Sequence, residues 1–149
     1  MSSSNQFEEI TLERGEVLFK KGDPCLNSYI VKSGHVACFS LSEDNRIIPT
    51  FTVRDNGVIA EDNIFSKEES YTYYAVILDT TTLVKIPNSE VMTFLGSSAD
   101  WMKTIIFDLA KKVLKTMDII VDHKILDERL NAGVELSSED SALLFKVIS

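Results

Sequence analysis

The first half of the chain alternates short apolar segments with clusters of turn-forming residues. Between Ile47 and Val53, the odd-numbered side chains are apolar and fall on one face of an extended segment, whereas threonines recur on the other face. This alternation predicts a half-buried strand, and Pro49 within it favours an edge strand or a bulge. Similar segments continue to Ile86, so about seven or eight short strands predict an antiparallel sandwich or barrel.

Turn signals separate the predicted strands. Ser33-Gly34 is expected to end a strand over 28–32, and a turn near Asp79 is expected to separate 75–78 from 82–86. Glycines at such corners commonly adopt a positive φ.

From Pro87 onward the apolar positions recur at helical spacing. Pro87-Asn88-Ser89-Glu90 is typical of a helix start, and Gly96-Ser97-Ser98 is expected to end that short helix. Residues from Ala99 to about Leu130 include neither Gly nor Pro, and their apolar positions lie three or four residues apart or at sums of these spacings. This pattern predicts a long amphipathic helix, so the fold class is mainly β with flanking α.

The long predicted helix is expected to find its partner in a second subunit. A helix of about 30 residues is roughly 45 Å long, which is more than a small sandwich can cover. The alternative is that the helix folds back on its own sheet, since Thr116, His123 and Asp127 interrupt the heptad pattern. The predicted dimer interface consists of Met102, Ile106, Leu109, Val113, Met117 and Ile120.

Composition and charge narrow the function. The 149 residues suffice for one domain with a substantial core, and 23 Asp and Glu against 15 Lys and Arg give a net charge of -8. A chain this acidic repels phosphate backbones, so nucleic-acid binding by this chain alone is not expected. No apolar run is long enough for a membrane helix and no export signal is seen, which predicts a cytoplasmic protein without a membrane partner.

No catalytic or metal-ligating set is recognisable. Cys25 and Cys38 are too few for a disulfide scaffold or a metal site, so we expect reduced thiols with packing roles. His35 and His123 lie outside any known catalytic or metal-binding spacing and are expected at the surface. The sequence therefore predicts no enzyme.

A specific resemblance is carried by two segments, Gly15-Glu16-Val17-Leu18-Phe19-Lys20-Lys21-Gly22-Asp23-Pro24 and Tyr29-Ile30-Val31-Lys32-Ser33-Gly34-His35-Val36. They resemble the opening of cyclic-nucleotide-binding domains of the Crp-Fnr class, and the similarity extends over roughly residues 10–130. The resemblance implies an antiparallel β jelly roll followed by a long C-terminal dimerisation helix. It also implies a regulatory module that acts on a protein effector or a fused effector domain.

The resemblance divides the chain into four regions. Residues 1–14 are expected to form a helical lead-in, residues 15–87 the jelly roll, and residues 88–130 the short helix and the dimerisation helix. Residues 131–149 contain a weak capping box, Ser137-x-x-Asp140, before an apolar turn. That turn either returns to the sandwich or begins a further element.

In this family the ligand site is a phosphate-binding cassette that reads Phe-Gly-Glu-(Leu or Ile), a spacer, then Arg-(Ser or Thr)-Ala. Its helix N-terminal amides and its arginine bind the cyclic phosphate, and its glutamate accepts a hydrogen bond from the ribose. The equivalent stretch here is residues 59–75, in which Glu61 matches the sugar-binding position and Ala60 replaces the glycine. Tyr73 and Tyr74 stand where Arg and Ser or Thr would precede Ala75.

The missing arginine lowers the expected affinity for a phosphate, because a tyrosine hydroxyl offers one neutral donor instead of a charged fork. Lys67 is the cation within the cassette that could compensate, and Asp62, Glu68 and Glu69 oppose an anion. Thr116 aligns with a purine-contacting position of the family, although a solvent or packing role is equally open. The candidate ligand-binding residues are Ile59, Ala60, Glu61, Lys67, Tyr73, Tyr74, Ala75 and Thr116.

Three hypotheses follow from the resemblance. The first is a dimeric regulatory module with weakened or lost cyclic-nucleotide binding, which passes a ligand or partner binding event through the long helix. The second is a functional cAMP or cGMP receptor in which Tyr73 or Lys67 replaces the arginine. The third is a structural protein-interaction module whose own tyrosines fill the pocket. The stretch after Leu130, with Lys146 its one basic residue, is too short for a helix-turn-helix domain.

Overall fold

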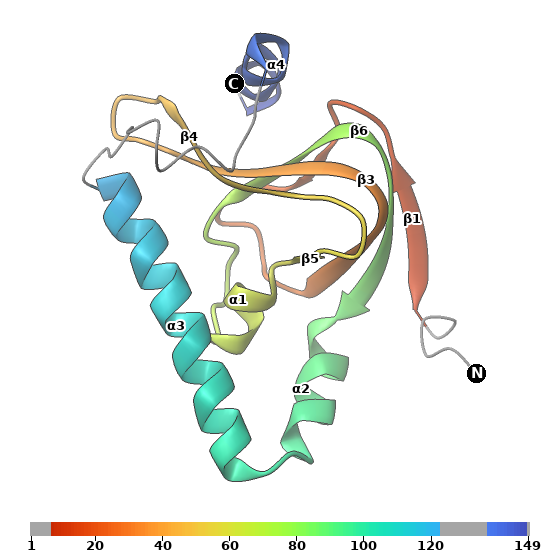
Figure 1. Cartoon of the computed structure of the whole chain (residues 1–149), viewed down its shortest axis with the longest axis vertical. Helices are drawn as coiled ribbons and strands as arrows, with labels where there is room; N and C mark the ends of the chain where they lie inside the picture. The colour runs from red at the N-terminus through yellow and green to blue at the C-terminus, as the bar shows by residue number, and fades with distance from the viewer. Residues whose placement is uncertain (1–6, 123–136, 149) are drawn as a thin grey trace.

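The computed structural model describes residues 7–122 and 137–148, and the structural statements below concern these residues. A sheet of strands curls into a roll, with helices below it and one helix across its outer side (Figure 1). The strands are β1 (Glu8–Leu12), β2 (Val17–Phe19), β3 (Asn27–Leu41), β4 (Ile47–Val53), β5 (Val58–Ile59) and β6 (Tyr74–Pro87). The helices are α1 (Glu61–Phe65), α2 (Asn88–Gly96), α3 (Asp100–Asp122) and α4 (Ser138–Ile148). The predicted class, mainly β with flanking helices, is confirmed.

All strand pairs are antiparallel, in the order β1-β6-β3-β4, with β2 beside β6 and β5 beside β3. The strands β3 and β6 have 15 and 14 residues and pair along most of their length. The pairing shifts register between Val31 and Val36, and such bulges bend and twist a sheet. This bend lets two long strands form both walls of the roll.

The expected strand ends at Ser33-Gly34 and near Asp79 are therefore wrong. Both positions lie inside continuous strands, at the bend of β3 and β6. Gly34 has a φ of 125° and packs against Thr81, whose hydroxyl accepts a hydrogen bond from the His35 N–H at 3.1 Å. His35 beside the bend is buried, contrary to its expected surface position, and burial lowers the pKa of its imidazole.

The predicted helical lead-in over 1–14 is also wrong where the structure describes it. Residues 8–12 form β1 and pair with β6 from Glu8 opposite Lys85 to Leu12 opposite Thr81. Ile10 and Leu12 are half-buried between exposed neighbours, which is the period of a strand with one face on the core.

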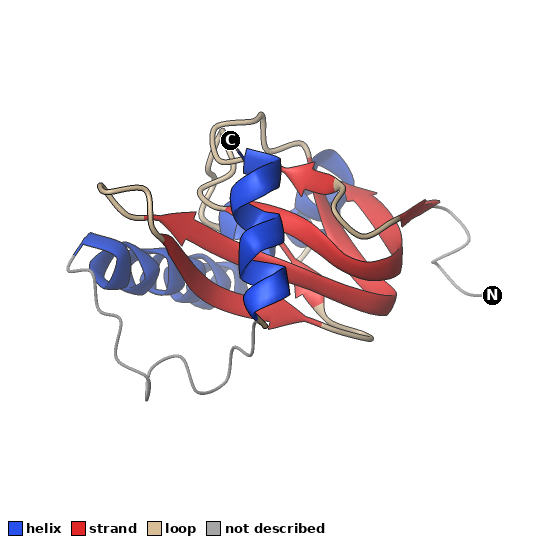
Figure 2. Cartoon of the chain, turned by 90° about the horizontal axis from the view of Figure 1, so that it is seen from above, coloured by secondary structure: helices blue, strands red, loops and turns tan. Residues whose placement is uncertain are grey.

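The sheet has an apolar cluster on each face. Inside the roll lie Val31, Val36, Cys38, Ala75 and Ile77 with their neighbours. The opposite face presents a second cluster, over which α4 lies crosswise (Figure 2). The C-terminal apolar turn thus returns to the sandwich within the described residues 137–148. Both cysteines are buried free thiols, as expected.

The helices α2 and α3 confirm the predicted short and long helices, although residues 123–130 of the long one lie outside the described residues. They descend from the roll as the two arms of a V, and α1 lies against the inner side of α3 (Figure 1). Among the residues described, no helix is long and apolar enough to cross a membrane.

Candidate functional site

The cassette begins where β5 leaves the sheet and the chain turns into α1. Ala60 at this junction is fully buried and has a φ of 74°, the left-handed conformation that favours glycine. The resembling sequences carry glycine at this position. An L residue here costs about 1–2 kcal/mol, so the surrounding contacts must hold the turn in place.

Tyr73 supplies the central contact. Its side chain is fully buried, and its hydroxyl accepts a hydrogen bond from the Ala60 N–H at 3.1 Å. The same hydroxyl donates to Asp62 Oδ1 at 3.0 Å. The ring lies edge-on to Phe51 and tilted against Phe19, with centroid distances of 5.4 and 5.6 Å. Tyr73 therefore occupies the interior of the roll beneath α1.

Asp62 is the acidic group of this interior. It is buried, and its Oδ1 also accepts hydrogen bonds from the Asn63 N–H at 2.9 Å and from Asn63 Nδ2 at 3.0 Å. Desolvation, with the nearby Cys38 and Asp62 adding to it, holds the pKa of Tyr73 well above its ordinary value, so its hydroxyl stays a donor. The Asp62 carboxyl group therefore already accepts the hydrogen bonds that Tyr73 and Asn63 donate at this site.

Asn63 closes the loop that follows α1. It is fully buried, and its Oδ1 accepts from the Thr72 N–H at 2.8 Å and from the Thr72 hydroxyl at 3.0 Å. These bonds tie the two ends of the spacer together. Sequence reasoning missed this role of Asn63 and treated Asp62 only as an unfavourable neighbour. Their position directly after the matched Glu61 was the available signal.

Glu61 lies at the start of α1, next to the space between α1 and α3. It borders a cavity of about 240 Å³ between α1 and α3, lined by Glu61, Asp62, Phe65, Ile106, Leu109, Ala110 and Val113. Glu61 is exposed on its outer side, yet the protein atoms on its inner side desolvate the carboxyl group. This desolvation, with a smaller effect from Asp62, raises its pKa to about 7 against an opposing backbone hydrogen bond.

Lys67 is also directed to α3. Its ammonium nitrogen lies 4.7 Å from the centre of the Phe107 ring, a cation–π distance. Two of the residues that were expected to contact a nucleotide sugar or phosphate, Glu61 and Lys67, thus border or touch α3.

The structure does not bring all predicted site residues together. Ile59, Ala60, Tyr73 and Ala75 are buried in the core inside the roll. Tyr74 instead faces the outer cluster and stacks on Phe39, with ring centroids 5.3 Å apart.

Two further residues considered from the sequence can be placed. Thr116 is exposed, and its hydroxyl donates to the Lys112 carbonyl of its own helix at 2.9 Å. Tyr71 fills the interior together with Tyr73, since its ring stacks on Phe19 at 3.8 Å. The expectation that tyrosines fill the pocket inside the roll therefore holds for Tyr71 and Tyr73, and it fails for Tyr74.

The predicted dimer interface divides into two sets. Met102, Leu109 and Val113 are 40%, 57% and 47% exposed on α3, and Leu109 and Val113 also line the cavity between α1 and α3. Ile106 and Met117 are half-buried, and Met117 packs on the chain's own core. The side chain of Ile120 lies outside the description. We call Met102, Ile105, Leu109 and Val113 the α3 outer stripe, because their spacing of three or four places them along one side.

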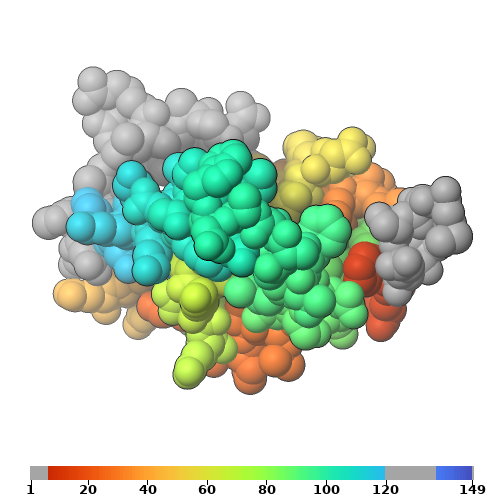
Figure 3. All heavy atoms as spheres, turned by 90° about the horizontal axis from the view of Figure 1, so that it is seen from below, coloured from red at the N-terminus to blue at the C-terminus, as the bar shows by residue number. Residues whose placement is uncertain are grey.

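A second, larger groove lies beside the α3 outer stripe. It has a volume of about 620 Å³ between α2 and α3, and its lining includes Phe65, Val91, Phe94, Met102 and Ile106. Figure 3 shows α2 and α3 next to each other on this underside, with α1 emerging beside α3.

The sequence model of the cyclic nucleotide-binding domain family matches residues 9–98, which is more than half of the chain. The chain therefore belongs to this family, and the predicted resemblance is confirmed. Its fold is the predicted antiparallel jelly roll with flanking helices.

Two kinds of relatives support this assignment. The chain is 25% identical over 127 residues to Electron transport regulator A of Shewanella oneidensis, covering 83% of this chain and 49% of that protein. The chain thus spans about half the length of this curated relative. The sensor domain of the transcriptional regulator DNR from Pseudomonas aeruginosa superposes with a TM-score of 0.65 at 17% identity, covering 77% of each chain. The cAMP-bound EAL enzyme Bd1971 gives 0.66 at 17% identity, covering 76% of this chain and 30% of that one.

Proposed function

We propose that this chain is a dimeric regulatory module whose cassette has lost ordinary cyclic-nucleotide binding and which relays a partner or ligand binding event through α3. One observation carries the proposal. The Tyr73 hydroxyl accepts the hydrogen bond of the Ala60 N–H and donates one to the buried Asp62 carboxyl group. These protein groups therefore bond to one another at the place where the family binds an anion.

The energetics favour loss of affinity. Each charge-assisted hydrogen bond that an arginine would make to a phosphate is worth about 1.5–3 kcal/mol, or one to two decades of affinity. Tyr73 removes the charge, and Asp62 adds an acceptor that repels a phosphate. Lys67 cannot replace the arginine without leaving the Phe107 ring.

The contacts between α1 and α3 supply the route for a signal. Lys67 packs on Phe107, and Glu61 and Phe65 share a cavity with Leu109 and Val113. A change in the position of α1 therefore alters the packing of the helix that carries the α3 outer stripe. Two packings of α3 on the roll would give the two states that a regulatory module needs.

The test is isothermal titration of about micromolar protein with cAMP and with cGMP. We expect no saturable heat up to about millimolar ligand, because the lost bonds shift the dissociation constant by several decades. Saturable binding that Glu61→Ala abolishes would contradict the proposal. The matched control is Glu68→Ala, which removes an exposed carboxyl group of the same cassette.

A functional cAMP or cGMP receptor is the second candidate. The observation in its favour is the likeness to a solved structure described as cAMP-bound and to another described as cGMP-bound. In such a receptor Glu61 would turn from α3 toward a ribose, and Tyr73 would give up its bond to Asp62. The titration above separates the two candidates. If neither nucleotide binds and α3 does not dimerise, the third candidate, a structural interaction module, remains.

A further inference from the structure

The outer face of the sheet is apolar, and α4 covers it. We define this outer face by Ala37, Phe39, Val76 and Leu78, each no more than 1% exposed. These residues alternate along β3 and β6 with those that face the interior of the roll, so they lie on the side opposite the cassette. Tyr73 and Tyr74 show the same division. Burial of this face depends on the helix that lies across it (Figure 2).

The helix α4 fits the outer face through a narrow apolar side. Leu144 is fully buried, and Leu143, Val147 and Ile148 pack half-buried around it. Glu139 and Lys146 on its other side are exposed. A helix of 11 residues is marginal on its own in water, so its structure depends on docking to the sheet.

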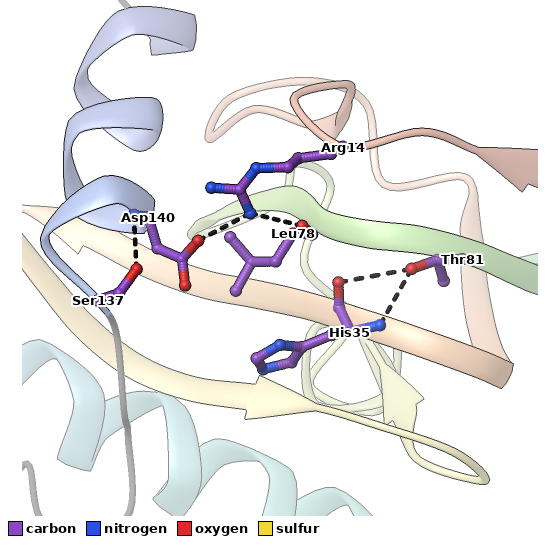
Figure 4. A network of polar contacts seen from close by, with 6 residues as sticks. All are labelled: Arg14, His35, Leu78, Thr81, Ser137 and Asp140. Atoms are coloured by element: carbon purple, nitrogen blue, oxygen red, sulfur yellow. Dashed lines mark hydrogen bonds and ion pairs between the residues drawn. The ribbon is translucent and has the colours of Figure 1, made fainter.

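A polar anchor sets the direction of the helix (Figure 4). Arg14 donates through Nη1 to the Leu78 carbonyl at 2.6 Å, and the same atom lies 2.8 Å from Asp140 Oδ1. Ser137 caps the helix, since its hydroxyl accepts from the Asp140 N–H at 3.0 Å. The cation thus lies in the turn between β1 and β2, and its acidic partner lies in the first turn of α4, where a negative charge also suits the helix dipole.

We propose that the outer face is a docking surface for an amphipathic helix of a partner protein, and that α4 occupies it in cis until such a helix displaces it. The partner helix carries an acidic residue in its first turn for Arg14 and aliphatic residues one turn later for the site of Leu144. This chemistry follows from the resident helix, which shows what the surface accepts. Because Leu144 is the one side chain of α4 that is completely buried, a helix that matches the outer face better can replace α4.

This inference goes beyond the proposed function, because it uses neither the cassette nor the α3 outer stripe. Nucleotide titration and oligomeric state test the proposed function, whereas binding of a helix to the outer face tests this proposal. Failure of one leaves the other standing.

The experiment uses a fluorescein-labelled peptide with the sequence of residues 137–149 as the probe, titrated into the full chain and followed by anisotropy. Leu144→Asp in the full chain removes the resident helix from the face and leaves the face itself unchanged. We expect this variant to bind the peptide at least about tenfold more tightly than the unmodified chain, in which α4 competes. Amide exchange should show loss of protection in α4 and retention in β3 and β6.

Two controls test the chemistry of the site. A peptide carrying Leu144→Asp should not bind. A peptide carrying Asp140→Arg should bind several-fold more weakly, and Arg14→Glu introduced into the Leu144→Asp chain should restore it.

Absence of peptide binding by a folded Leu144→Asp chain would overturn the proposal, and so would equal binding by both chains. If Leu144→Asp does not fold, Asp140→Arg in the full chain serves instead, because it weakens the anchor from the side of α4 and leaves Arg14 and the apolar cluster unchanged. The same comparison then decides. An unmodified chain that sediments as a dimer and becomes monomeric with excess peptide would identify a second copy as the occupant and overturn occupancy in cis.

Discussion

Tyr73 shows how one residue changes the character of the cassette. An arginine at this place would direct a permanent charge toward a bound anion, whereas the tyrosine hydroxyl satisfies the Ala60 N–H and the Asp62 carboxyl within the chain. The change exchanges a binding group for a structural one. It also supports Ala60 in its left-handed conformation, since the N–H of this residue has found a buried acceptor.

Tyr73→Phe should therefore destabilise the fold. The substitution keeps the ring and removes the hydroxyl, which leaves a buried N–H without its acceptor and Asp62 without one of its donors. We expect a loss of about 2–3 kcal/mol in the free energy of unfolding, measured by urea denaturation. Tyr74→Phe is the matched control, because its half-buried ring remains stacked on Phe39, and it should cost less than about 0.5 kcal/mol. Equal losses for the two variants would contradict this account.

At the scale of elements, the bend shared by β3 and β6 decides the architecture. Gly34 stands at this bend with a φ of 125°, and a Cβ atom there would lie 2.6 Å from the Thr81 Cα. Both the positive φ at position 34 and the close approach of Thr81 require glycine there. The register shifts around this point turn a flat pair of strands into a roll, which brings β5 and α1 over the interior.

Gly34→Ala should be severely destabilising. The added methyl group meets the Cα and the side chain of Thr81, and the positive φ adds strain, so we expect a loss of about 3 kcal/mol or more. Gly22→Ala is the matched control, because Gly22 has a φ of 96° and open space around its Cβ position. Thermal unfolding should show a loss of only about 1 kcal/mol for that variant. A mild effect at Gly34 would mean that the strands adjust at the bend.

At the scale of the whole molecule, α3 presents one side to the roll and another to its surroundings. Ala110 and Leu114 are buried against the chain, and Met102, Ile105, Leu109 and Val113 form the exposed α3 outer stripe. An exposed apolar stripe along a helix is typical of an interface. Within the predicted dimer interface, Met102, Leu109 and Val113 are the members that belong to this exposed stripe.

Leu109→Arg should weaken dimerisation, because it places a charge in the centre of the α3 outer stripe. We expect the dissociation constant of the dimer to rise by about tenfold or more, as measured by sedimentation equilibrium. Thr104→Arg is the matched control, since it adds the same side chain at an exposed position about 100° or more around the helix from every residue of the stripe. An unchanged monomer–dimer equilibrium in Leu109→Arg would show that α3 does not form the dimer interface.

Local periodicity predicted much of this fold. Alternating residues predicted β4, helical spacing predicted α2 and α3, and the order of the glycine-containing segments indicated the family. Each of these signals depends on residues a few positions apart, and the spacing of side chains along a strand or helix is a local property. The resemblance failed for residues 8–12, and the local turn signals failed at Gly34, because partners far along the chain decide the structure at both places.

The amino-acid sequence by itself determined the strand and helix periods, the family resemblance and the absence of an arginine from the cassette. Only the tertiary structure decided that Tyr73 faces the interior and Tyr74 the outer cluster, that Glu61 borders the space between α1 and α3, and that α4 lies on the outer face. These choices depend on the register and closure of the sheet. A shift of one residue in a strand exchanges its two faces, so contacts between distant segments select the face that local spacing leaves open.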